Sequence, residues 1–114
     1  MPDRTDLQPA LLQGTLDVMI LSVLQREALH GYGIARQIER LSGAVLSIEE
    51  GSLYPALHRM TKRGELSAEW RTSDTGRRAR FYRLTGDGRT KLSGQTGLWQ
   101  KLASAVSRVV DRFV

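Results

Sequence analysis

Apolar side chains recur at helical spacing in four stretches of this chain, which predicts four helices. The first prediction covers residues 10–26, whose apolar positions are Leu12, Leu16, Met19, Ile20, Val23 and Leu24. A turn at His30 and Gly31 precedes a second helix over residues 32–41. Residues 44–48 form a short apolar connector, compatible with an edge-strand residue or two, that leads to the third helix.

The third helix has one apolar side and one small or basic side. Leu53, Leu57 and Met60 fall together, and the opposite side carries Gly51, Pro55, His58, Arg59 and Lys62. Proline is tolerated in a first helical turn, so we expect the helix to begin near residue 50 or 51, and Gly64 to end it. No carboxylate follows the first turn, so this side suits an anionic partner such as DNA; an ordinary amphipathic surface helix has the same pattern.

Two short stretches after this helix alternate as strands do. Residues 65–70 place Leu66, Ala68 and Trp70 on one side, and residues 80–85 form a second strand candidate. The polar segment between them, residues 71–79, has Gly76 near its tip. A helix followed directly by a basic hairpin is the order of a winged helix-turn-helix, so the fold class expected is mainly α with a small β-hairpin (α+β).

The fourth helix follows Thr85, a residue type that caps helix starts. Its stripe recurs at steps of three, four and seven: Leu92, Trp99, Leu102, Val106, Val109 and Phe113. The first three helices already supply a core, so we expect this stripe to meet a second chain and form a homodimer. The alternative is that the helix folds back over the first helix. Residues 10–85 are thus predicted to form the winged domain, and residues 86–114 a C-terminal dimerisation helix.

Composition narrows the function classes. The net charge is +5, and residues 61–91 hold nine basic and four acidic residues, as expected where phosphates are neutralised. A solvated basic face explains that excess as well. There is no cysteine, no apolar run long enough to cross a membrane and no secretory pattern at the start, so we expect a cytoplasmic protein without disulfides.

No residue pattern supports catalysis, a metal or a cofactor. His30 and His58 are the two histidines, and no carboxylate is spaced to complete a metal site with them. Ser52 and His58 are not helical neighbours and lack a third orienting group. His30 is better explained as a residue at the start of the second helix. We therefore expect a protein that is not an enzyme.

Four motifs together resemble the PadR family of bacterial transcriptional regulators. They are His-Gly-Tyr-Gly-Ile at residues 30–34, Glu-Gly-Ser-Leu-Tyr-Pro-Ala-Leu-His-Arg-Met at 50–60, Gly-Glu-Leu at 64–66 and Arg-Ala-Arg-Phe-Tyr-Arg-Leu-Thr at 78–85. The similarity extends over roughly residues 10–110. It implies a winged helix-turn-helix homodimer that represses its target gene by occupying operator DNA. The length resembles the short subgroup, in which a single C-terminal helix mediates dimerisation.

The resemblance also implies which residues meet DNA. On the third helix these are Ser52, Tyr54, Pro55, His58 and Arg59. Arg59 and His58 are candidates for reading base edges, and Ser52 and Tyr54 for binding phosphate. On the hairpin, Arg77, Arg78 and Arg80 are candidates for following the backbone or entering a narrow minor groove.

Two other function classes stay open. Regulators of this kind that bind many drugs place aromatic residues of the last helix at the dimer centre, so Trp99 is a candidate ligand-binding residue for a small aromatic effector. Plain dimer contact is the other interpretation of Trp99. The second class is a winged-helix module that binds protein rather than DNA; the five arginines between residues 71 and 83 argue against it.

Overall fold

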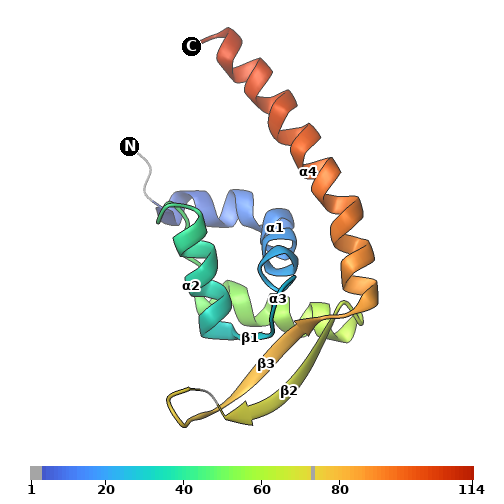
Figure 1. Ribbon diagram of the computed structural model, residues 1–114. Coiled ribbons are helices and arrows are strands. Elements are labelled where there is room, and N and C mark those ends of the chain that lie inside the picture. The colour runs from blue at the N-terminus through green and yellow to red at the C-terminus, as the bar shows by residue number, and fades with distance from the viewer. Residues whose placement is uncertain (1–3, 73) are drawn as a thin grey trace.

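The computed structural model describes the backbone of residues 4–72 and 74–114, and the side chains of residues 14–72 and 74–114. The elements follow the order α1 (Arg4–Val23), β1 (Leu29–His30), α2 (Gly31–Leu41), α3 (Glu50–Lys62), β2 (Leu66–Thr72), β3 (Arg78–Leu84) and α4 (Gly86–Arg112). The structure is therefore mainly helical with a small antiparallel sheet, as expected from the sequence (Figure 1).

The sheet has the strand order β1-β3-β2, with both pairings antiparallel. The hairpin forms where it was predicted, but β2 ends two residues later and β3 begins two residues earlier than residues 70 and 80, so the connecting segment is shorter. The third strand is not where the sequence indicated it. Residues 44–48 contain no strand, and Leu29 and His30 pair instead with Tyr82 and Phe81 of β3. His30 has an extended backbone because it caps α2, and this conformation allows it to join the sheet edge.

The first helix begins earlier and ends earlier than predicted, at Arg4 and Val23. Gln25 accounts for its end, because both its backbone nitrogen and its side-chain Nε2 bond to the Ser22 carbonyl, at 3.3 and 3.1 Å. These bonds satisfy a carbonyl that has no partner inside the helix. The side chain of Leu12 lies outside the described residues.

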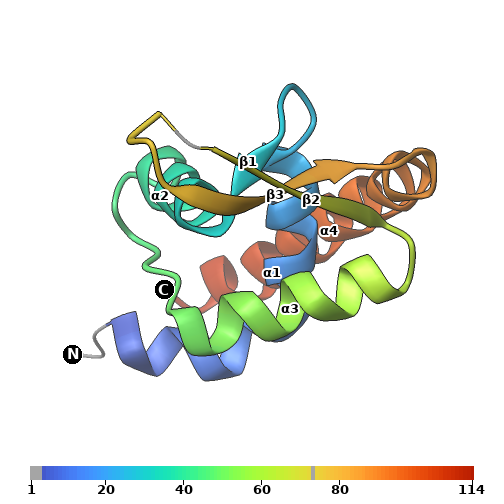
Figure 2. The ribbon, with the colours of Figure 1, turned by 90° about the horizontal axis from the view of Figure 1, so that it is seen from below.

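The core lies where α1, α2, α3 and the hairpin meet. Figure 2 shows α2, α3 and the hairpin arranged around α1. The largest fully buried side chains are Ile20, Leu21, Leu24, Ile34, Leu53, Leu57, Met60 and Leu66. The predicted apolar side chains of α3, Leu53, Leu57 and Met60, are all buried in this core, so the polar side of α3 faces outward. On α2, Ile34 and Ile38 are buried as predicted, but Leu41, also predicted to face inward, is exposed at the end of the helix.

The third helix begins at Glu50, as predicted, but this start places Pro55 in the second turn rather than the first. A proline there leaves the carbonyl of the residue four positions earlier, Gly51, without its helical hydrogen bond. Both residues are exposed, so solvent can reach that carbonyl. Gly64 follows the helix with a φ of 81°, the left-handed conformation expected of a C-terminal glycine.

The last helix runs without interruption through Gly94 and Gly97. Thr85 caps it through a 3.0 Å bond from the Gly88 nitrogen to the threonine hydroxyl. Its first turns pack against α1, and Leu92 is buried there. Its C-terminal half projects from the rest of the molecule (Figure 1). Within the described residues, no helix has the length and apolar character needed to cross a membrane.

Candidate nucleic-acid interface

The outward side of α3 is small and polar. The exposed residues on this side are Ser52, Tyr54, Pro55 and His58. The buried residues of the same helix are Leu53, Ala56, Leu57 and Met60. Gly51 has open space around it: a Cβ atom there would meet nothing within 4 Å. This side of the helix therefore offers a low profile that lets another surface approach closely.

Tyr54 connects α3 to the start of α2. Its ring lies so close to Gly31 that a Cβ atom on Gly31 would stand 2.7 Å from the tyrosine hydroxyl oxygen. Gly31 is buried, so the absence of a side chain there is what lets the two helices meet. The contact holds the exposed edge of Tyr54 beside the first turn of α2.

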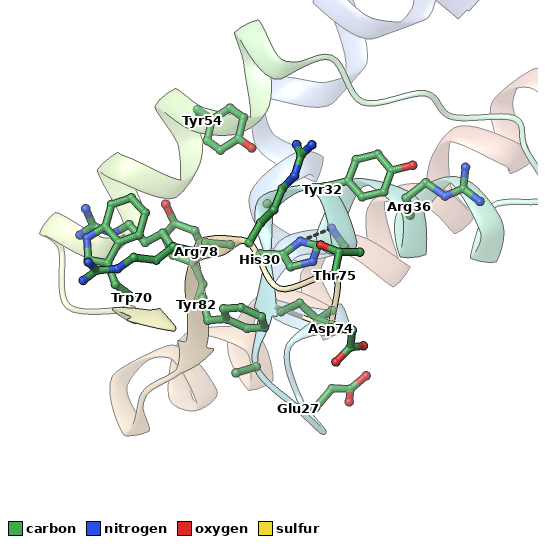
Figure 3. Close-up of a pocket in the computed structure, with 18 residues that line it drawn as sticks. Glu27, His30, Tyr32, Arg36, Tyr54, Trp70, Asp74, Thr75, Arg78 and Tyr82 are labelled. Carbon is green, nitrogen blue, oxygen red and sulfur yellow. Dashed lines mark hydrogen bonds between the residues drawn. The ribbon is translucent and has the colours of Figure 1, made fainter. Parts of the chain in front are cut away.

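The first turn of α2 presents further polar groups on the same side. His30 caps the helix, its Nδ1 accepting a 3.0 Å bond from the Gly33 nitrogen, which is dashed in Figure 3. Tyr32 is 67% exposed, and the Arg36 guanidinium lies 6.0 Å from the centre of its ring. That separation is at the limit of a cation–π contact.

The two faces of the hairpin differ in how their charges are compensated. On one face Glu69 lies 3.6 Å from Arg71 and 3.8 Å from Arg83. Arg78 and Arg80 alternate with those residues along the strands and so lie on the other face. Among the described residues, neither Arg78 nor Arg80 forms an ion pair, and the Arg78 guanidinium lies 5.6 Å from the ring of exposed Trp70.

A groove of about 980 Å³ separates the hairpin from the helices. Figure 3 shows Tyr54, Tyr32 and Arg36 on its helical side, and Trp70 and Arg78 on its hairpin side. Its cationic lining consists of Arg36, Arg77, Arg78 and Arg80, against two carboxylates, Glu27 and Asp74. The groove is thus a positively charged channel beside the outward side of α3.

Tyr82 lies at the base of this groove. Burial raises the pKa of its hydroxyl above the usual value; the positive charge of Arg80 opposes this increase and Tyr54 adds to it. At neutral pH Tyr82 therefore remains uncharged and does not cancel the positive charge of the groove.

Arg59 has a partner within the chain. Its Nη2 donates a 2.7 Å bond to Asp17 of α1, and its side chain is 39% exposed. The pair joins α1 to the flank of α3 rather than to its outward centre. The sequence pattern predicted Arg59 on the outward side of α3, and nothing in that pattern indicates the contact with Asp17.

The apolar stripe of α4 is buried at its start and exposed along the rest of its length. Leu92 is buried in the core of its own chain. The later members of the predicted set are exposed by 43 to 82%: Trp99, Leu102, Val106, Val109 and Phe113. The exposed part, with Leu98 and Val110, is here called the α4 stripe.

Comparison with known proteins gives the family. The sequence model of the transcriptional regulator PadR-like family matches residues 20–94. The chain belongs to this family. PadR-like proteins are transcriptional regulators and not enzymes, and the helices and hairpin described here form their DNA-binding winged helix-turn-helix.

Individual relatives agree. The transcriptional regulator Rv3488 of Mycobacterium tuberculosis is 35% identical over 77 residues, which cover 68% of each protein. A transcriptional regulator from Clostridium thermocellum has a similar structure, with a TM-score of 0.74, 27% identity and coverage of 91% of this chain and 97% of that one. A PadR-like transcription factor from Bacteroides fragilis also has a similar structure, with a TM-score of 0.70, 28% identity and coverage of 91% of this chain and 98% of that one.

Sequence reasoning overlooked three residues of this PadR-like groove: Tyr32, Arg36 and Trp70. A signal for the first two was present, because Tyr32 and Arg36 are four residues apart on one side of a predicted helix. Trp70 was predicted to share one side of its strand with Leu66 and Ala68. The register of the hairpin agrees with that side, but Trp70 is 57% exposed because the strand extends past the core.

Proposed function

We propose that this PadR-like regulator is a homodimer that represses transcription in the cytoplasm by occupying a palindromic operator. Two copies of α3 would enter successive major grooves, about 34–36 Å apart. His58 on the outward side of α3 is suited to base edges, and Ser52 and Tyr54 to phosphate. The winged domain of residues 10–85 would bind DNA and residues 86–114 would join the two copies.

The observation that carries this proposal is the unpaired charge of the groove. Arg78 and Arg80 lack a carboxylate partner among the described residues, whereas Arg71 and Arg83 share Glu69 on the other face. A cation without an internal counter-ion is available to a phosphate, and each phosphate neutralised releases counter-ions from DNA. The groove lies beside the outward side of α3, so one DNA backbone can follow it while α3 occupies the adjacent major groove.

The α4 stripe supports the dimer. It is apolar, exposed and continuous along the projecting half of the helix. A helix face of this kind is self-complementary across a two-fold axis, so a second copy of the chain is the occupant with matching chemistry.

Selection of duplexes from a random DNA pool tests the whole proposal. We expect an enriched palindrome, bound by two chains, whose affinity falls steeply with salt concentration. Equal binding to every duplex, or an affinity indifferent to salt, would contradict operator recognition and favour a module that binds protein.

The two faces of the hairpin allow a matched test of the groove. We expect Arg80→Ala to weaken binding to all duplexes alike and to reduce the salt slope by about 1, as loss of one phosphate contact does. Arg83→Ala removes the same charge from the compensated face and should change the slope much less. The measurement is fluorescence anisotropy over a salt series. Equal losses from both variants would show that net charge alone acts, without the groove.

A second candidate function is a regulator released by a small aromatic effector. The observation that favours it is Trp99, which is 43% exposed and follows two glycines, Gly94 and Gly97, that have no neighbour within 4 Å of a Cβ position. In a dimer joined by the α4 stripe, two indoles near the two-fold axis can hold a planar ring between them.

A further inference from the structure

The end of α3 and the start of α4 meet at a single junction, formed by Gly64, Glu65, Thr85 and Gly88. On the α3 side, the Glu65 nitrogen bonds to the Met60 carbonyl at 3.0 Å. This bond spans the left-handed Gly64 and closes the last turn of the helix. The backbone of Glu65 is therefore fixed to α3.

The cap of α4 bonds to the same segment. The Thr85 hydroxyl oxygen lies 2.7 Å from the Gly64 carbonyl oxygen and 3.0 Å from that of Glu65, so its single hydrogen is within reach of both. The Thr85 nitrogen donates to the Glu65 carbonyl at 3.2 Å, and the hydroxyl also accepts the α4 capping bond from Gly88. One side chain thus joins the C-terminal end of α3 to the N-terminal end of α4.

Gly88 allows the two backbones to touch. A Cβ atom on Gly88 would overlap the Glu65 carbonyl oxygen and lie 2.8 Å from Leu84 Cδ1. The carbonyl is part of a hydrogen-bonded cap and cannot turn aside as a flexible side chain could. Gly86 and Gly94 of the same helix have nothing within 4 Å, so the close approach is specific to Gly88.

The side chain of Glu65 reinforces the contact. Its carboxylate lies 3.5 Å from Lys91 of α4, and the side chain is only 10% exposed. The junction therefore contains backbone bonds, a capping hydroxyl, a close glycine contact and an ion pair, all between the ends of two helices. Such a junction resists a change in the angle at which α4 leaves the winged domain.

We propose that this junction sets the spacing between operator half-sites, with Thr85 and Gly88 as positioning residues. The inference rests on the proposed function, because it requires that α4 joins two chains and that α3 enters DNA. Val106 lies about 27 Å from Gly88 along α4, at about 1.5 Å per residue. A rotation of about 3.5° at the junction moves that point by about 1.7 Å. Because a two-fold dimer repeats the rotation in its second chain, the relative displacement reaches about 3.3 Å, close to the 3.4 Å rise of one base pair.

The test uses the full-length chain and a series of duplexes in which two half-sites are separated by one base pair more at each step. The wild type, Gly88→Ala, Gly86→Ala, Thr85→Ala and Thr85→Ser are compared by anisotropy on every duplex and on a single half-site. Sedimentation measures dimerisation, and circular dichroism measures folding. Gly86→Ala is the matched control, since it adds the same methyl group two residues away in open space.

We expect the wild type and Gly86→Ala to prefer the same spacing. Gly88→Ala should shift the preferred spacing, or reduce the preference for the wild-type spacing over neighbouring spacings by about tenfold. The affinity of Gly88→Ala for a single half-site should stay within about twofold of the wild-type affinity. Thr85→Ala should act in the same direction, and Thr85→Ser, which keeps the hydroxyl, should restore the wild-type profile.

A folded, dimeric Gly88→Ala variant with the wild-type spacing profile would overturn the inference, as would an equal loss on all duplexes including the half-site. If Gly88→Ala does not fold, the Thr85 pair decides, and identical profiles for Thr85→Ala and Thr85→Ser overturn it. Failure of the wild type to bind any palindrome would instead contradict the proposed function itself, so the two failures are distinguishable.

Discussion

Helices α3 and α4 both carry long apolar stripes, yet they use them in opposite ways. The apolar residues of α3 are at most 1% exposed at Leu53, Leu57 and Met60, and its outward side is left to small and polar groups. In α4 Val106 and Phe113 are 51% and 82% exposed. The difference shows that an apolar pattern alone does not identify a core helix; the number of elements available to cover it also matters.

The polar surroundings of the two helices differ too. The outward side of α3 lies beside the arginine-lined groove, which favours an anionic partner. The side of α4 opposite the stripe carries charges of both signs, among them Arg108 and Asp111, at about 100° per residue. A helix with one apolar side and one side of mixed charge has no excess of positive charge to attract an anionic partner. The outward side of α3 therefore favours DNA, and the α4 stripe favours the second protein chain proposed above.

The largest expected effect comes from placing a charge in the α4 stripe. In the proposed dimer, Val106→Glu would bury two carboxylates in the two-fold interface, one from each chain, without partners. We expect the dimer dissociation constant to rise by at least about 100-fold, or about 2.7 kcal/mol, because an unpaired buried charge is costly. Sedimentation over a concentration series measures this, and palindrome binding should weaken in parallel.

Ser104→Glu is the control, because it adds the same charge on the opposite side of α4 at about 100° per residue. We expect it to leave dimerisation nearly unchanged. A wild-type chain that is a stable monomer at micromolar concentration would contradict the dimer and remove the contrast between the two helices.

Local signals in the sequence were sufficient for much of this architecture. Glu50, Gly64 and Thr85 marked helix ends, and the alternation after α3 identified the hairpin. Each of these signals acts within a few residues, so it is readable without knowing the rest of the fold. The family resemblance then added the class of regulator.

Features that depend on distant residues were not predictable in the same way. β1 has only two residues, and it exists because β3, about 50 residues later, pairs with it. Leu92 was assigned to the dimer stripe, but the place of α1 against α4 buries it. The partner of Arg59 lies 42 residues away in sequence. Spacing in a sequence cannot distinguish a residue that meets its own chain from one that meets another.

We expect an intermediate effect on DNA binding when Arg59 is replaced. Arg59 lies between the outward side of α3 and the side that packs against α1. A base-reading role predicts that Arg59→Ala loses discrimination between sites by about 1–3 kcal/mol. The 2.7 Å bond to Asp17 leads us to expect a different result: a uniform loss on all duplexes, and a coupling of about 1 kcal/mol with Asp17→Asn in unfolding. Binding to matched and mismatched operators, with denaturant unfolding of the double-mutant cycle, measures both.

Asp17→Asn alone separates the two roles. It leaves the arginine in place but removes the opposite charge that holds it. If site discrimination survives Asp17→Asn and fails in Arg59→Ala, then Arg59 reads bases despite its partner, and the outward side of α3 extends further round the helix than the exposed residues indicate.

The smallest expected effect concerns Trp99, and it tests whether the α4 stripe serves only for contact between chains. If two copies of Trp99 enclose a planar aromatic molecule, the fluorescence of Trp99 should be quenched when that molecule is added. We expect a dissociation constant in the micromolar to millimolar range, which corresponds to a binding free energy of about 4–8 kcal/mol.

Trp70 also emits, so the titration is made in the Trp70→Phe variant. The matched control is Trp99→Phe, which retains Trp70 in the groove. A ligand bound between the two chains would change how they are placed relative to each other, and so would weaken binding to the operator. The ligand should lower the affinity for operator by the same factor by which operator lowers the affinity for ligand, since such coupling is reciprocal. If planar aromatics at millimolar concentration do not change the emission of Trp99, this residue serves for contact between chains alone. The α4 stripe would then have one kind of partner, the second protein chain.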